Sequence, residues 1–365
     1  MLHATQTGLQ RVILTAVDTG DDRQRLDVEL DEFEALARAA GTDVIARMIQ
    51  HRPAVDPATL VGAGKAEELA QIVHEQEADG VLVLNPLRPR QRAALEKLIG
   101  GDAFVLDRNV VILDIFARHA RTAEGKLQVE LAQLRHRAAN LIGARDSLSR
   151  LGGGIGTRGP GETKLEVDRR RIRLRISHLE EQLAQVRKRR REQRRAREGT
   201  PLVALVGDTN AGKSSLLNAL TGSAVFVADQ PFATLDPTLR KMRLDDGRFV
   251  VLADTVGFIT DLPKELLAAF RATLEEVTSA AMLIHVVDAS NPFWDRQRKA
   301  VETVLATLGA VDKPMIVAWN KIDVAQAPHD AGYAVSAKTG EGLDQLRAGL
   351  ANALPRDALA ARRTT

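Results

Sequence analysis

The eight residues GDTNAGKS at positions 207–214 constrain the fold more than any other stretch of the chain. They match GxxxxGK[ST], follow the apolar run LVALV and open the run KSSLLNALTG, which is the strand–loop–helix context of a phosphate-binding loop. Glycines let backbone N–H groups face phosphates, and the helix N-terminus adds its dipole. We expect Lys213 to contact the β- and γ-phosphates and Ser214 to bind Mg²⁺. For this motif alone, a glycine-rich turn is the alternative.

Three further motifs lie at the ends of predicted strands. In NKID (320–323), Asp323 offers two acceptor oxygens to the N1–H and N2–H₂ donors of guanine, a donor pair that adenine lacks. In DTVG (254–257), we expect Asp254 to hold the metal through water and the Gly257 amide to meet the γ-phosphate. SAK (336–338) fits the loop behind the base. The four motifs in this order predict a P-loop domain that binds and hydrolyses GTP.

The segment FATLDPT (232–238) lies where a GTPase carries the loop that senses the γ-phosphate. A threonine there can place its hydroxyl on Mg²⁺ and its N–H near the γ-phosphate, and both Thr234 and Thr238 qualify. An ordinary loop threonine is the alternative. With Thr234 selected over Thr238 by the family resemblance given below, the predicted catalytic residues are Lys213, Thr234 and Gly257, and the predicted metal ligands are Ser214, Thr234 and, through water, Asp254. The residues expected to bind GTP are Gly207, Asp208, Thr209, Asn210, Ala211, Gly212, Lys213, Ser214, Ser215, Phe232, Ala233, Thr234, Leu235, Asp236, Asp254, Thr255, Val256, Gly257, Asn320, Lys321, Ile322, Asp323, Ser336, Ala337 and Lys338.

Phe258 stands where many GTPases place a glutamine that orients the attacking water, a task that a phenyl ring cannot perform. Either hydrolysis is slow until a partner completes the site, or another element orients the water. Asn210 in the phosphate loop resembles the asparagine of GTPases activated by K⁺. An asparagine making a local turn bond is the equally open alternative.

The order of apolar runs predicts an α/β chain of several parts. Short β-rich runs alternate with helical runs before residue 117 and again after residue 202, the pattern of parallel sheets. The predicted parts are an N-terminal parallel α/β domain (1–117), a basic helical hairpin (118–198) with a glycine-rich tip (152–162), a linker (199–201), a Ras-like GTPase domain (202–355) and a C-terminal tail (356–365).

The hairpin is predicted from apolar residues spaced four and three apart. Leu127, Leu131 and Leu134 begin one such seam, and Ile176, Leu179 and Leu183 lie on another. Glycine and proline in GGGIGTRGPGE prevent helix between the two segments. An antiparallel pair of helices with a projecting tip is the simplest arrangement.

Charge is concentrated in this hairpin. Residues 118–198 hold 22 lysines and arginines against 10 acidic residues, a net charge of +12, whereas the whole chain carries +3, which leaves −9 for the rest. Such a block indicates a polyanionic partner, most simply RNA. Aromatic residues are only 3%, which argues against a base-stacking platform and favours structured RNA. A solvated coiled-coil surface is the alternative. The candidate RNA contacts are Arg158, Arg189, Arg190 and Arg191.

Composition excludes several other classes of protein. The chain has no cysteine, so a disulfide framework, a thiolate zinc site and a cysteine nucleophile are excluded. Its eight histidines form no ligand-spaced cluster. No apolar run approaches the roughly 20 residues that span a bilayer, so we expect no integral membrane segment. We expect the protein to lie in the cytoplasm and to be a monomer.

The chain resembles the HflX family of ribosome-associated GTPases. The resemblance rests on SRLGGGIGTRGPGETKLEVDRRRIRLRI (149–176), LDIFARHARTAEGKLQVELAQL (113–134), ATLVGAGKAEEL (58–69) and FATLDPT (232–238). It implies that Thr234 is the metal-binding threonine, that the protein binds the large ribosomal subunit and dissociates stalled or stressed ribosomes, and that the hairpin tip reaches toward the peptidyl-transferase centre. It also implies that the C-terminal domain of longer members is missing or reduced here.

Two other functions stay open at this point. The first is a GTP-gated module that binds ribosomal RNA and for which hydrolysis is incidental. The second is an ATP-dependent RNA remodeller that uses the N-terminal domain, where GAGK (62–65) invites a second phosphate-loop interpretation. Its spacing differs from GxxxxGK[ST], so a strand-to-helix turn is favoured.

Overall fold

The computed structural model describes residues 9–20, 23–149, 164–195, 200–223, 231–232, 237–258, 274–328 and 330–354. They belong to two compact units, which are described separately: residues 1–118 with 129–181, and residues 119–128 with 182–365. The predicted fold class is confirmed, with a parallel α/β sheet first, a helical hairpin next and a second α/β sheet last. The domain boundaries expected from the sequence stay a prediction.

The N-terminal sheet contains four parallel strands in the order β2-β1-β3-β4. Each lies in one of the short β-rich runs of this part of the sequence. Their bounds are β1 Gln10–Asp18, β2 Thr42–His51, β3 Gly80–Val83 and β4 Phe104–Asp107. Successive residues of β1 from Val12 onward are buried, because helices cover both faces of the sheet.

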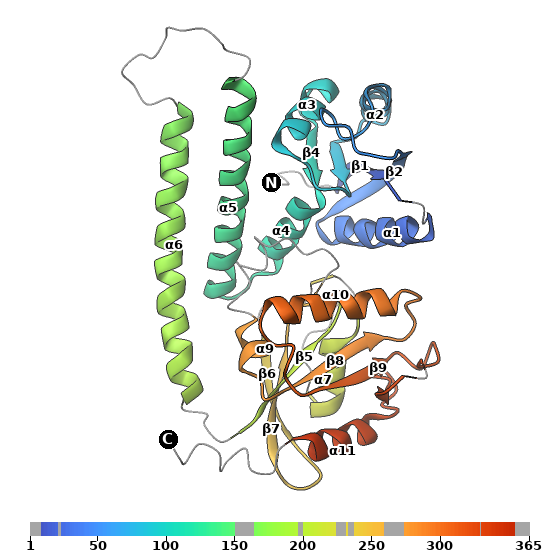
Figure 1. Cartoon of the computed structure of the whole chain (residues 1–365), viewed down its shortest axis with the longest axis vertical. Coiled ribbons are helices and arrows are strands. Elements are labelled where there is room, and N and C mark those ends of the chain that lie inside the picture. Colours follow the sequence, from blue (N-terminus) through green and yellow to red (C-terminus); the bar gives the residue numbers. More distant parts are fainter. Residues whose placement is uncertain are drawn as a thin grey trace. The chain divides into compact units, whose positions relative to one another are not determined.

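Four helices accompany this sheet (Figure 1), namely α1 Arg23–Ala39, α2 Ala63–Glu75, α3 Pro89–Ile99 and α4 Arg108–His119. α2 and α3 pack on one face, where Leu69 and Leu95 join Ile13 and Val83 in a single core. Helix α4 was not predicted as a separate helix. It begins directly after β4, and its Val110 amide donates to the carboxylate that ends that strand.

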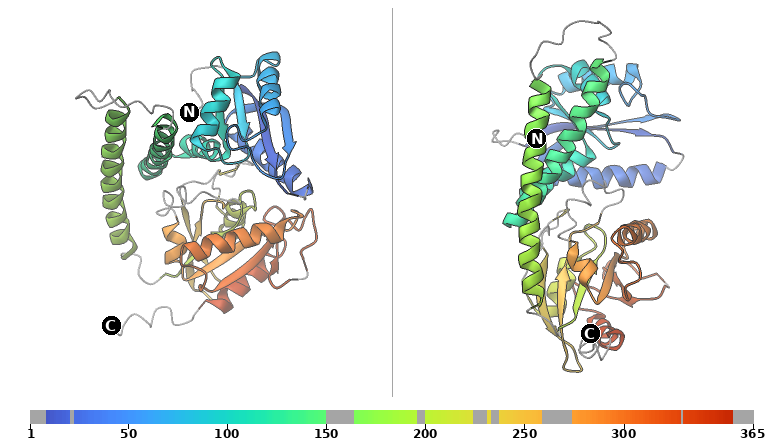
Figure 2. Two further views of the ribbon diagram at one scale, coloured as in Figure 1. Left: turned by 45° about the horizontal axis from the view of Figure 1, so that its top comes forward. Right: turned by 60° about the vertical axis from the view of Figure 1, so that its left-hand side comes forward.

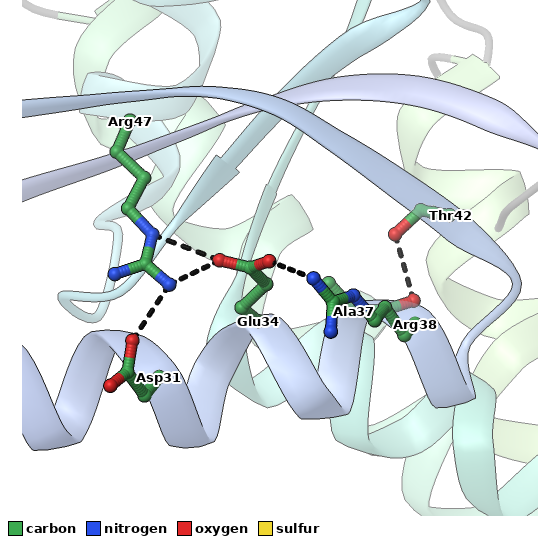
Figure 3. Close-up of polar contacts among 6 residues, drawn as sticks. All are labelled: Asp31, Glu34, Ala37, Arg38, Thr42 and Arg47. Atoms are coloured by element: carbon green, nitrogen blue, oxygen red, sulfur yellow. Dashed lines mark hydrogen bonds and ion pairs between the residues drawn. The ribbon is translucent and has the colours of Figure 1, made fainter.

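Helix α1 is attached to the edge strand β2 by an exposed ionic cluster (Figure 3). The Nε of Arg47 donates to Glu34 at 2.9 Å, and its guanidinium also reaches Asp31 at 2.7 Å. The hydrogen bond that Arg47 donates to the Glu34 carboxylate raises the pKa of Arg47. At the turn between the two elements, the Thr42 hydroxyl donates to the Ala37 carbonyl at 2.7 Å. The cluster sets the position of α1 more than it stabilises the fold, since exposed ion pairs contribute little individually.

The predicted helical hairpin is formed by α5 (Ala123–Ser149) and α6 (Lys164–Arg195), which lie side by side in Figures 1 and 2. Leu179 and Leu183 of the predicted seam are buried. The two helices are also joined by ion pairs: Arg175 contacts both carboxylate oxygens of Glu130 at 2.7 and 2.9 Å, and Arg135 contacts Glu180 at 2.7 Å. The predicted tip, residues 152–162, lies outside the described residues.

The second sheet has six strands in the order β10-β9-β8-β5-β7-β6, and β6 is antiparallel to its neighbour. The strands are β5 Leu202–Val206, β6 Thr238–Arg243, β7 Phe249–Asp254, β8 Met282–Asp288, β9 Met315–Asn320 and β10 Tyr333–Ala334. The described helices of this part are α7 Lys213–Thr221, α9 Glu275–Ser279, α10 Trp294–Thr307 and α11 Leu343–Ala353. Leu216 of α7 and Leu346 of α11 share one core with the sheet, while Trp294 of α10 packs edge-on against Trp319 of β9.

His285 of β8 is the most strongly perturbed histidine that the structure describes. Its side chain is 1% exposed, and its Nδ1 has no hydrogen-bond partner among the described residues. Burial, with smaller contributions from the charges of Arg298 and Lys213, lowers the pKa of His285 from 6.5 to about 4. The imidazole is therefore neutral in the folded protein at pH 7.

We expect His285 to make stability depend on pH between about 6.5 and about 4. The unfolded chain takes up the proton first, so stability is present above the ordinary pKa of 6.5 and is lost as pH falls toward 4. The loss amounts to about 3 kcal/mol. His285→Leu should remove this dependence, whereas His178→Gln, at an exposed position of α6, should retain it. Denaturant unfolding at a series of pH values measures it, and parallel curves for wild type and His285→Leu would contradict the assignment.

Candidate functional site

The phosphate loop connects β5 to α7 at the carboxyl edge of the second sheet, and two of its glycines are required by close approach. A Cβ on Gly207 would lie 2.2 Å from the Val286 carbonyl oxygen, and a Cβ on Gly212 would lie 2.2 Å from Nδ2 of Asn320. Gly212 also has φ +90, which disfavours other residues. Asn210 lies between them with φ +59, a conformation that asparagine tolerates better than most residues.

Lys213 begins α7 and folds back over the loop. Its Nζ donates to the carbonyl oxygens of Asp208 at 2.6 Å and Gly207 at 3.1 Å. Burial lowers the pKa of Lys213, while the nearby carboxylates of Asp254 and Asp208 act in the opposite direction. A buried cation within the loop suits the binding of phosphate oxygens.

Ser214 and Asp254 face each other across the site. The Ser214 hydroxyl donates to Oδ2 of Asp254 at 2.5 Å, and the Asp254 side chain is fully buried at the end of β7. Thr255 follows it, and its hydroxyl donates to the Leu205 carbonyl at 2.6 Å, which fixes the turn after the strand. A hydroxyl and a carboxylate are the hard oxygen donors that Mg²⁺ prefers, so the residues present fit this ion.

Residues 257 and 258 form a short bridge to the phosphate loop. The Phe258 amide donates to the Gly207 carbonyl at 3.0 Å, and the Thr209 amide donates to the Phe258 carbonyl at 2.9 Å. The Phe258 ring is 2% exposed, so it is a core side chain rather than a solvent-facing group. At Gly257, a Cβ would lie 2.8 Å from the Thr209 Cα and 3.1 Å from the Lys213 Nζ, which excludes a side chain.

The amide of Asn320 joins the phosphate loop to the loop of the SAK motif. Its Nδ2 donates to the Ala211 carbonyl at 2.8 Å, and its Oδ1 accepts from the Ala337 amide at 3.0 Å. The side chain is almost fully buried at the end of β9. Asn320 therefore acts as a connector between loops.

Asp323 lies against the same loop. Its Oδ1 accepts a hydrogen bond from the buried Ser336 hydroxyl at 2.8 Å, and the Lys338 Nζ is 4.0 Å from its Oδ2. The Ile322 amide donates to the Val335 carbonyl at 3.3 Å. Ser336 thus fixes one carboxylate oxygen of Asp323 and, with it, the orientation of the carboxylate.

Asp288 was not among the predicted site residues. Its Oδ2 lies 2.6 Å from the Nζ of Lys321. An aspartate that ends a buried strand beside the NKID strand is the signal that could have found it, because parallel strands end at one edge.

Burial differs among the remaining predicted site residues. Ser215 is half-buried on α7, and Val256 and Phe232 are buried, Phe232 with φ +59. Ala233, Thr234, Leu235 and Asp236 lie outside the described residues, as does Arg158. Arg189, Arg190 and Arg191 belong to α6, where the Arg189 side chain is exposed. The assignment of these residues to the nucleotide site or to RNA contacts stays a prediction.

The GAGK residues 62–65 open α2. Gly62 is its N-terminal cap, and its amide donates to the Gln50 side chain at 2.8 Å. The Lys65 ammonium pairs with Glu68 on its own helix at 2.7 Å. The geometry agrees with a strand-to-helix turn.

The described part of the chain shows neither a metal-binding cluster of acidic and histidine side chains nor a membrane-spanning helix. It contains no cluster of three or more histidine, aspartate or glutamate side chains arranged to hold a metal ion. Within the same residues, we find no helix whose length and apolar character would let it traverse a lipid bilayer.

Comparison with known proteins adds three family matches. They are described as GTP-binding GTPase N-terminal over residues 27–117, GTP-binding GTPase Middle Region over 119–197, and 50S ribosome-binding GTPase over 202–321. A GTPase HflX from Lacrimispora saccharolytica is 50% identical over 347 residues, which cover 92% of this chain and 81% of the relative. The GTPase HflX of Escherichia coli K12 is 46% identical over 328 residues, covering 89% and 76%.

Among solved structures, the GDP complex of SsGBP resembles this chain with a TM-score of 0.53 at 24% sequence identity. The match covers 95% of this chain and 98% of that one. At this identity the likeness concerns the fold, and it extends over both α/β sheets and the hairpin between them.

We expect Asp323→Asn to weaken GTP binding and to shift the base preference toward xanthine nucleotides. Asparagine presents one donor and one acceptor where aspartate presents two acceptors, and xanthine offers an acceptor where guanine has a donor. The loss of one charge-assisted hydrogen bond predicts about a 10-fold or greater loss of GTP affinity. Titration with fluorescent GTP and XTP analogues measures both effects. An unchanged GTP affinity would remove the assignment of the base site.

Proposed function

Because the chain belongs to the HflX family of GTPases, we propose that it binds the large ribosomal subunit through its N-terminal domain and basic hairpin and, with GTP bound, dissociates stalled or stressed ribosomes. GTP hydrolysis then resets the protein. The observation that carries this proposal is the presence, on one chain, of a nucleotide site and a long basic helical hairpin. A ribosomal partner places the protein in the cytoplasm, where we expect a monomer.

In the proposed reaction, each motif residue has one role. Lys213 contacts the β- and γ-phosphates, the Gly257 amide meets the γ-phosphate, and Asp323 reads guanine. P-loop GTPases generally use Mg²⁺, which neutralises charge on the phosphates. Here Ser214 and Thr234 would hold it directly and Asp254 through water. The contact between Ser214 and Asp254 supports this assignment, because it brings two of the oxygen donors together.

We further propose that this chain hydrolyses GTP slowly by itself. Phe258 has no group that could orient water, and its ring is buried. The backbone bridge to Thr209 and Gly207 favours retention of that ring in the core. Asn210, in an exposed position of the phosphate loop, is the candidate residue for binding K⁺.

Basal GTP turnover should therefore be slow, increase strongly with ribosomes or large subunits, and be faster in potassium than in sodium salts. Phosphate release measured with and without purified subunits in each salt tests this expectation. Asn210→Ala should abolish the difference between the salts. The proposal would be contradicted if the isolated protein turned over GTP rapidly, at the same rate in both salts, and if ribosomes did not change that rate.

The hairpin supplies the proposed RNA contacts. Arg173, Lys188 and Arg189 are exposed on α6, in the segment of net charge +12. Cations arrayed along paired helices can neutralise successive phosphates and release counterions. The glycines of residues 152–162 remove side-chain bulk where the tip would approach crowded RNA, and Arg158 is the one lysine or arginine in that tip sequence.

Subunit separation on sucrose gradients tests the proposed function. Wild-type protein with a non-hydrolysable GTP analogue should convert ribosomes into subunits, whereas the GDP form should not. Replacing residues 152–161 with a short Gly-Ser turn should impair this separation more than it impairs binding, and it should leave GTP affinity unchanged because the GTP-binding motifs lie elsewhere.

The tip replacement is compared with a second variant, in which the charges of Arg189, Arg190 and Arg191 are reversed. The charge reversal should weaken binding and flatten its salt dependence, because fewer counterions are released. Normal separation by the tip replacement would show that the tip has no mechanistic role.

A further inference from the structure

Asp288 and Lys321 meet where two neighbouring strands end. Asp288 is the last residue of β8 and lies in register with Asn320, the last residue of β9. The Ala289 amide donates to the Asn320 carbonyl at 2.9 Å, so the two strand ends are tied together one residue before Lys321. Asp288 is therefore positioned by the sheet rather than by a loop.

The Asp288 carboxylate is itself held in one orientation. Its Oδ1 accepts hydrogen bonds from the Ser290 amide at 2.9 Å and the Ser290 hydroxyl at 2.5 Å. Its Oδ2 is thereby directed to the Lys321 Nζ at 2.6 Å. The side chains of Asp288 and Lys321 are 15% and 35% exposed, so solvent screens this pair less than it screens an ordinary surface ion pair.

The backbone conformation of Lys321 indicates what the ion pair with Asp288 contributes. Lys321 has φ +68, in the left-handed region that non-glycine residues adopt at an energetic cost. This turn lies between the buried connector Asn320 and the base-reading candidate Asp323. An ion pair that fixes the Lys321 side chain also helps to hold the turn from which Asp323 projects.

We infer that Asp288 is a positioning residue for the guanine nucleotide, acting through Lys321. The carboxylate keeps the Lys321 side chain extended across the end of β8, so that its methylene groups form one wall of the slot for the base. This inference rests on the proposed base site and adds to it the residue that shapes the slot. Asp288 makes no contact of its own with the nucleotide in this arrangement.

A double-mutant cycle on the full chain tests the inference. Asp288→Asn should weaken the binding of fluorescent GDP and of a fluorescent GTP analogue by the same factor, about 3- to 10-fold. In the Lys321→Ala background, Asp288→Asn should cause no further loss, because its only route to the nucleotide is gone. Ser290→Ala, which keeps the charge and the backbone amide bond but removes the hydroxyl bond to the carboxylate, should produce a smaller loss in the same direction.

Asp295→Asn is the matched control, since it breaks an exposed aspartate–lysine pair of the same 2.6 Å length on α10. It should leave nucleotide affinity unchanged. Equal losses from Asp288→Asn with and without Lys321 would overturn the inference, as would a lowered melting temperature with unaltered affinity. If wild-type protein instead failed to prefer guanine over adenine nucleotides, the proposed base site would fail, which is a separate result.

Discussion

The side-chain amide of Asn320 is the interaction on which the rest of the nucleotide site depends. It donates to the phosphate loop at Ala211 and accepts from the SAK loop at Ala337, so one buried group connects two loops separated by more than a hundred residues of chain. Both partners are backbone groups. Removing the amide would leave a buried donor and a buried acceptor unpaired, which costs more than a surface hydrogen bond.

This connection explains why the phosphate loop tolerates so little side-chain bulk. Gly212 lies so close to Asn320 that a methyl group would displace the amide, and Gly207 lies equally close to β8. On its other side, the loop is joined through Thr209 to the backbone of Phe258. The phosphate loop, the segment after β7 and the base-side loops therefore form one hydrogen-bonded unit, in which a shift of one loop is transmitted to the others.

The sequence predicted the elements that depend on local pattern. Both sheets, the hairpin and the position of each described motif at a strand end follow from apolar periodicity and from motif spacing. Helix α4 was not separated, because Asp107 both ends β4 and accepts from the Val110 amide, which leaves no turn residues to mark a boundary. Asp288 could have been found from its place at a strand end, but its contact with Lys321 was not predictable. It depends on which strands are neighbours and on their register, and neither is contained in local pattern.

The contacts within the basic hairpin also change how its charge is interpreted. Counted from the sequence, every arginine in it is available to RNA, but Arg175 and Arg135 join α5 to α6 through Glu130 and Glu180. The hydrogen bond that Arg175 donates to Glu130 raises the pKa of Arg175, as expected for a cation held by a carboxylate. These pairs help to set the alignment of the hairpin. The cations that can contact a polyanion are therefore the outward-facing remainder, such as Arg173. Each ion pair removes one carboxylate together with one arginine, so the net charge of +12 is unaffected, whereas the count of 22 lysines and arginines overstates the cations available to RNA.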